Sequence, residues 1–147
     1  MERSRPSAHR RMLIESVVLV AAAPSVQMAW LHQAGVEPDE IALYFDDAFR
    51  LAERLVEDGQ IGQGALALLR MIDEVFDGMT QDTGADRWSG EALSTDAGWE
   101  RARELACEVL IVTRVEAHQE DTDPVEAGPD ALSPAAWAVS EPGARKP

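Results

Sequence analysis

An amphipathic helix near the middle of the chain constrains the fold more than any other stretch. Residues 37–59 read EPDEIALYFDDAFRLAERLVEDG. Pro38 suits the first helical turn, where its missing N–H has no partner to lose, and Gly59 can adopt the left-handed conformation that ends many helices. Between them, apolar residues recur at steps of three and four, namely Ile41, Phe45, Ala48, Ala52 and Leu55. This spacing predicts one continuous helix from Pro38 to about Asp58, with one face packed on a core.

A second strongly periodic stretch follows after a short turn. Residues 60–64 (QIGQG) contain two glycines and predict that turn. The next helix is predicted from Ala65 to about Met79, and its apolar face consists of Leu66, Leu69, Ile72, Val75, Phe76 and Met79. A short connection between two helices implies an antiparallel hairpin, which we expect at the centre of the fold.

The N-terminal third is apolar, but its pattern does not distinguish a helix from a strand. Residues 12–23 are apolar on a wide face, which favours a helix, whereas the β-branched residues within 16–20 would also fit a buried strand. A short second helix is predicted over residues 26–34, with Ser25 as its cap and Gly35 at its end.

A polar loop and one more long helix complete the predicted domain. Residues 80–90 are polar, and Trp88 is expected to hold this loop against the core. The last helix is predicted to be capped by Ser94 or Thr95 and to continue to about residue 116, since its apolar residues keep helical spacing.

Together these elements predict an all-α fold, a single compact bundle of four to five helices over residues 12–116. An α+β fold is the alternative if residues 16–20 form a strand. Residues 1–11 lack apolar periodicity and are expected to be a disordered arm. Residues 117–147 are acidic and rich in proline, which is typical of a disordered tail, and they contain Trp137.

The charge is strongly negative and belongs to the predicted domain. The whole chain carries −14, of which residues 12–116 carry −13, while residues 1–11 carry +3 and residues 117–147 carry −4. Such a field repels nucleic-acid phosphates and anionic membranes and attracts basic protein surfaces. We therefore expect neither direct nucleic-acid binding nor membrane binding. A cytoplasmic location is expected for another reason: Glu15 interrupts the apolar run after Arg11, and no stretch approaches the length of a membrane span.

Residue patterns that carry known chemistry are missing from the sequence. It contains no phosphate-binding loop, dinucleotide-binding glycine pattern, HExxH, CxxC or G-x-S-x-G. The single cysteine, Cys107, is expected to be a small buried residue, and His9, His32 and His118 are far apart in the sequence. The sequence thus predicts no catalytic residues, no cofactor and no metal site, and an enzyme is the less favoured class.

The function that best fits this charge is a non-catalytic interaction protein that binds a basic protein partner. One concrete form is an inhibitor, such as the immunity protein of a bacterial toxin or effector. The predicted contact residues are acids of the central helix: Asp39, Asp46, Asp47, Glu53 and Glu57.

Two other classes stay open at this stage. A small ligand-binding or enzymatic helical domain would place a pocket between the Pro38 helix and the Thr95 helix, next to Trp30, Tyr44, Asp47 and Trp99. A homo-oligomeric structural subunit is the third possibility.

Overall fold

All regular secondary structure in the described part of the chain is helical. The computed structural model describes residues 7–84 and 86–121, and these residues contain no strand. Residues 16–20 lie inside the first helix, so the α+β alternative is wrong and the all-α prediction is confirmed. The helices are α1 Ala8–Ala21, α2 Pro24–Ala34, α3 Asp39–Phe49, α4 Ala52–Glu57, α5 Gln63–Gln81, α6 Gly90–Thr95 and α7 Ala97–Asp121.

The chain divides into two units, residues 1–113 and residues 114–147. Of the second unit, residues 114–121 are described, and they form the end of α7. Most of the predicted tail, with Trp137, and residues 1–6 of the predicted arm lie outside the described residues.

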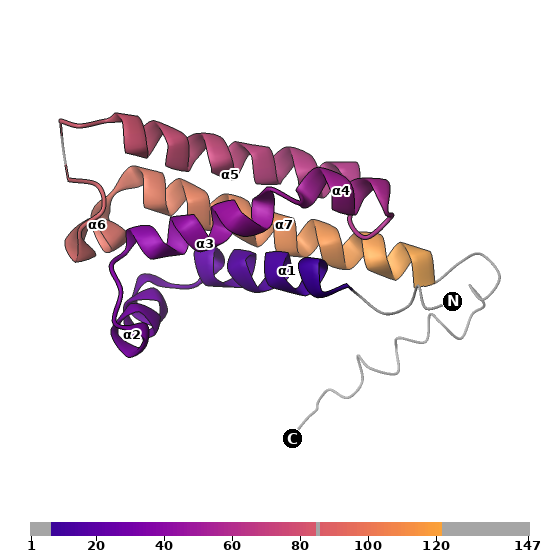
Figure 1. The fold of residues 1–147 in the computed structure, drawn as a ribbon, viewed down its shortest axis with the longest axis horizontal. Helices are drawn as coiled ribbons and strands as arrows, with labels where there is room; N and C mark the ends of the chain where they lie inside the picture. The colour runs from indigo at the N-terminus through magenta and orange to yellow at the C-terminus, as the bar shows by residue number, and fades with distance from the viewer. Residues whose placement is uncertain (1–6, 85, 122–147) are drawn as a thin grey trace, which may run out of the picture. The chain divides into compact units, whose positions relative to one another are not determined.

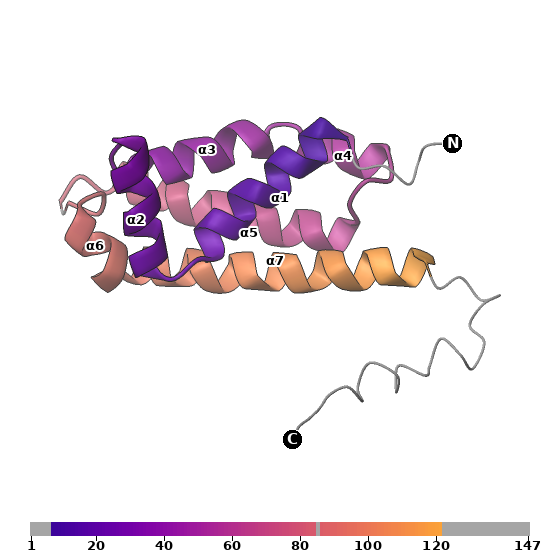
Figure 2. The same ribbon diagram turned by 90° about the horizontal axis from the view of Figure 1, so that it is seen from below.

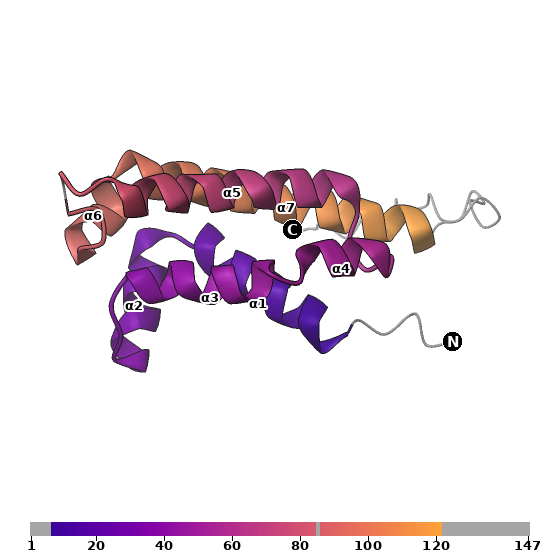
Figure 3. The same ribbon diagram turned by 45° about the horizontal axis from the view of Figure 1, so that its top comes forward.

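Within the first unit, α5 and the start of α7 run antiparallel and side by side (Figure 1). Helix α1 packs chiefly against α3, and α4 contacts both α1 and α5. Figure 3 shows α1 and α3 together on one side of the α5–α7 pair, and in Figure 2 α1 crosses in front of α5. The predicted hairpin is formed by α4 and α5, which are joined by residues 58–62, and α3 precedes α4 in the chain.

The central helix is not continuous as predicted. Helix α3 ends at Phe49 and α4 begins at Ala52, with a turn at Arg50 and Leu51 between them. The Leu51 N–H donates to the Ala48 carbonyl at 3.2 Å, a bond to the third preceding residue that tightens the chain locally. Neither Pro nor Gly marks this break, and the apolar spacing runs through it, so the pattern could not predict it.

Two glycines end helices as the sequence predicts. Gly35 follows α2 and Gly59 follows α4, with φ angles of 71° and 74° in the left-handed region. Because side chains disfavour this region, glycine fits both positions.

The N-caps differ from the predicted ones. Pro24 is itself the first residue of α2, so Ser25 is not its cap. Ser89 caps α6 by accepting a hydrogen bond from the Ala92 N–H at 3.0 Å. Ser94 and Thr95 therefore lie inside α6 and do not cap α7.

Helix α1 starts earlier than expected, so residues 8–11 are helical and not part of a disordered arm. Ser7 caps the helix by accepting from the Arg10 N–H at 3.1 Å. Ser7 N–H and the Arg10 Nε also donate to Gln60, at 3.1 and 3.0 Å. Polar contacts with the loop after α4 thus hold a segment that has no apolar pattern of its own.

An aromatic cluster occupies the core where the second half of the chain packs on α3. Phe76 of α5 lies 5.3 Å from Trp99 and 6.0 Å from Phe45, measured between ring centroids. Trp88 packs against both Phe76 and Trp99, at 6.2 and 5.6 Å. Trp88 therefore anchors its loop to the core, as predicted.

Polar groups join this cluster to the start of α7. Trp99 is fully buried, and its indole N–H donates to the Arg87 carbonyl at 3.0 Å. The Arg87 guanidinium makes a two-pronged pair with Asp96, at 3.0 and 3.2 Å, and also reaches Asp82 at 3.3 Å. Asp96 caps α7 by accepting from the Gly98 N–H at 2.8 Å.

This junction leaves no room for a side chain at Gly98. A Cβ there would lie 2.7 Å from the Met79 sulfur and 2.9 Å from both Arg87 Nη2 and Asp96 Oδ2. Gly98→Ala is therefore expected to lower the free energy of unfolding by about 1–3 kcal/mol, although alanine is the better helix former.

The matched control is Gly78→Ala in α5, where a Cβ would meet nothing within 4 Å. It should raise the free energy of unfolding by about 0.5–1 kcal/mol, because alanine loses less backbone entropy in a helix. Urea denaturation of both variants tests the pair. Equal stabilisation by both substitutions would show that the junction is not close-packed.

Candidate interaction surface

The acidic charge is concentrated on α3, α4, α5 and the loops beside them. Residues 37–82 contain twelve Asp and Glu side chains and three Arg, a net charge of −9. Most apolar residues of these helices face the core, so the carboxylates are left at the surface or near it. We call residues 37–82 the acidic segment.

All three arginines of the acidic segment pair with acids of the same segment. Arg50 contacts Asp46 at 3.2 Å, within α3 and the turn that follows it. Arg70 of α5 contacts Glu53 of α4 at 2.7 Å, and Arg54 lies 3.9 Å from Asp58. Exposed pairs of this kind contribute only about 0–1 kcal/mol each, and they leave most of the segment's negative charge uncompensated.

The five predicted contact residues all reach the surface, on two helices instead of one. Asp39 and Asp47 are exposed on α3, and Asp46 beside them is half-buried. Glu53 and Glu57 are exposed on α4. Asp46 and Glu53 are the two that take part in the ion pairs described above.

The structure adds an acid that is not among the predicted contact residues. Asp73 of α5 is half-buried, and its pKa is raised above its ordinary value. Burial is the main cause, and the charges of Asp46, Asp77 and Glu74 add to it. The sequence gives the spacing of the three acids on α5, but only the packing of α3 on α5 brings Asp46 into this group.

A raised pKa has a definite consequence for stability. The folded protein disfavours the charged form of Asp73, so ionisation destabilises the fold at any pH above the raised pKa. Asp73→Asn should therefore be more stable than the wild type at pH 7. The difference should shrink as the pH falls through the raised pKa, and vanish below the ordinary carboxyl pKa, where Asp73 is protonated in both states.

Chemical denaturation at a series of pH values measures this effect. Glu108→Gln, which removes one exposed carboxylate from α7, is the control and should change stability by less than about 0.5 kcal/mol. A variant Asp73→Asn that is less stable than the wild type at pH 7 would contradict the expectation.

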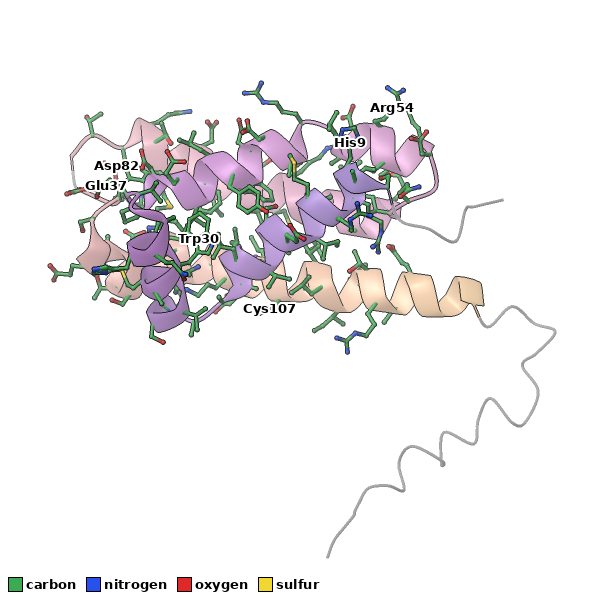
Figure 4. All side chains as sticks on the ribbon, turned by 60° about the horizontal axis from the view of Figure 1, so that its bottom comes forward. His9, Trp30, Glu37, Arg54, Asp82 and Cys107 are labelled. Atoms are coloured by element: carbon green, nitrogen blue, oxygen red, sulfur yellow. The ribbon has the colours of Figure 1, made fainter. Side chains whose placement is uncertain are left out.

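The residues expected near a pocket lie in three different environments. Trp30 of α2, which is labelled in Figure 4, stacks on Tyr44 of α3, with parallel rings and centroids 6.3 Å apart. The Tyr44 hydroxyl donates to Glu15 at 3.5 Å, and the pKa of Tyr44 is raised by burial and by that carboxylate. Trp99 belongs instead to the aromatic cluster of the core, and Asp47 is exposed.

Cys107 is exposed on α7, so the prediction that it is buried is wrong. The buried face of α7 is formed by Ala102, Leu105, Ala106 and Val109, and Cys107 lies outside it. Its sulfur lies 4.0 Å from the Ala21 carbonyl of α1. Among the side chains that the structure describes, no group of three or more His, Cys, Asp or Glu is placed to hold a metal ion.

Comparisons with known proteins give no relative for this chain: no family model, no curated protein and no solved structure matches it. None of the helices in the described ranges is long and apolar enough to cross a membrane.

Proposed function

We propose that this protein is a non-catalytic, acidic helical interaction protein that binds a basic protein partner. The observation that carries the proposal is the negative charge of the acidic segment, −9 over residues 37–82. Its own three arginines are already paired, and from outside the segment Arg87 reaches one of its acids, Asp82. Such a field attracts a basic surface over a distance and accelerates association.

An inhibitor of a basic effector is the concrete form that we favour, for example the immunity protein of a bacterial toxin acting in the cytoplasm. An inhibitor of this kind has to capture its target quickly, and electrostatic attraction raises the association rate. The contacts are assigned to Asp39, Asp46, Asp47, Glu53 and Glu57, which reach the surface on consecutive helices. A ligand-binding or enzymatic domain and a homo-oligomeric subunit stay predictions of the sequence.

The test is affinity purification of tagged protein from its native host at low salt. The wild type is compared with a variant in which the five contact acids become amides: Asp39→Asn, Asp46→Asn, Asp47→Asn, Glu53→Gln and Glu57→Gln. The wild type should retain one basic protein in stoichiometric amount, lost as salt rises, because screening weakens the attraction. The amide variant should retain little of it.

The control variant removes the same amount of charge elsewhere, through Glu15→Gln, Glu91→Gln, Glu100→Gln, Glu104→Gln and Glu108→Gln. It should retain the partner nearly as well as the wild type, since these residues lie on α1, α6 and α7. Equal retention by both variants would show that the acidic segment is not the binding surface. A preparation of the tagged protein alone would favour a ligand-binding or enzymatic domain.

A further inference from the structure

One exposed leucine lies at the centre of the acidic face of α3. Leu43 is 51% exposed, whereas Ile41 and Phe45 of the same helix are buried. On a helix surface, the neighbours of a residue are those three and four positions away. For Leu43 all four of these positions are acidic: Asp39, Glu40, Asp46 and Asp47.

This arrangement occurs at no other exposed large apolar side chain among the described residues. These side chains are Val18, Val26, Met28, Leu43, Met71, Ile111 and Val115. Apart from Leu43, each has at most one Asp or Glu at the positions three and four residues away. Among the described residues, an exposed large apolar side chain with four acidic neighbours thus occurs only on α3.

The combination resembles the usual anatomy of a binding site for another protein. An apolar contact at the centre supplies much of the affinity once water is excluded, and a charged rim gives orientation and a fast association. A second copy of this chain is a poor occupant, because it would bring another strongly acidic surface against the four carboxylates. Cations are the groups that complement this rim.

We propose that the outward face of α3 docks a basic segment of the partner, with an apolar side chain of that segment seated on Leu43. Cationic side chains on either side of the apolar one would then reach the acidic ring. This inference rests on the proposed function and adds to it the chemistry of the partner's contact: an apolar residue flanked by Arg or Lys.

Two synthetic peptides serve as the probe. Both are helical and rich in Arg and Lys, and they differ only at one central position, which is Leu in one and Ser in the other. Binding of each to the wild type, to Leu43→Ser and to Ile111→Ser is measured by fluorescence anisotropy at low and high salt. Ile111 is the control because it is also exposed, at 62%, but lies on α7.

The wild type should bind the Leu peptide about tenfold more tightly than the Ser peptide, the gain expected for removing the exposed part of a leucine from water. Leu43→Ser should abolish this preference, and Ile111→Ser should keep it. The preference should persist at high salt, because apolar burial is not screened, while both affinities fall.

The outcomes separate the two proposals. Salt-dependent binding of both peptides with equal affinity would overturn the role of Leu43 and leave the acidic binding surface in place. A preference that survives Leu43→Ser would place the apolar contact elsewhere and would also overturn it. Failure of both peptides to bind at low salt would overturn the proposed function together with this inference.

Discussion

The pairing of Arg87 with Asp96 is the interaction on which the second half of the fold depends. It joins the loop after α5 to the first turn of α7, and it does so beside the most buried aromatic residue of the core. Burial alone would raise the pKa of Asp96, but the hydrogen bonds from Arg87 and from the Gly98 N–H outweigh it and hold that pKa below its ordinary value. The carboxylate is therefore ionised at neutral pH, both as helix cap and as ion-pair partner.

A second polar contact joins helices in the first half of the fold to those in the second. The buried amide of Gln27 donates to the Leu19 and Val20 carbonyls at the end of α1, at 3.1 and 3.0 Å. Its oxygen accepts from Arg103 of α7 at 3.3 Å, and Arg103 also donates to the Leu93 carbonyl of α6. Because buried polar groups cost free energy unless they are paired, these contacts restrict how α1, α2, α6 and α7 can pack.

With the apolar faces fixed in this way, the acids of α3, α4 and α5 are turned outward. Within these helices and the turns after them, three exposed ion pairs attract the acids to arginines. Asp73, by contrast, lies close to other carboxylates, and their repulsion costs stability. A folded protein gains nothing in stability from such repulsion. A role in binding a cationic partner gives a physical reason for the pattern, because the partner would neutralise the repulsion when it binds.

Local sequence patterns predicted much of the fold. Contacts between residues far apart in the sequence account for most of the differences between prediction and structure. Periodicity located the apolar faces of α3, α4 and α5, and the glycines after α2 and α4 were recognised from their place after an apolar pattern. The contact of Gln27 with Arg103 joins residues 76 positions apart, and no single segment contains a signal for it. Ser94, Thr95 and Asp96 are all suitable cap residues ahead of α7, and in the structure the Asp96 side chain is the one that accepts from the Gly98 N–H.

The candidate surface was also predicted only in part from the sequence. Charge and helical spacing were sufficient to select the acids of α3 and α4. The approach of Asp46 to Asp73 depends on packing between helices and was not visible in either pattern. Leu43 was not selected from the sequence, because its importance depends on the exposure that the structure shows.

The most direct test of the central claim is to map the surface that a basic protein contacts. In a titration of isotope-labelled protein with the basic partner recovered by affinity purification, NMR amide shifts report each residue separately. Binding through the acidic segment predicts shifts concentrated in α3, α4 and the outer side of α5, and their disappearance as salt is raised. Shifts concentrated on α1 and α7, with α3 unaffected, would contradict it.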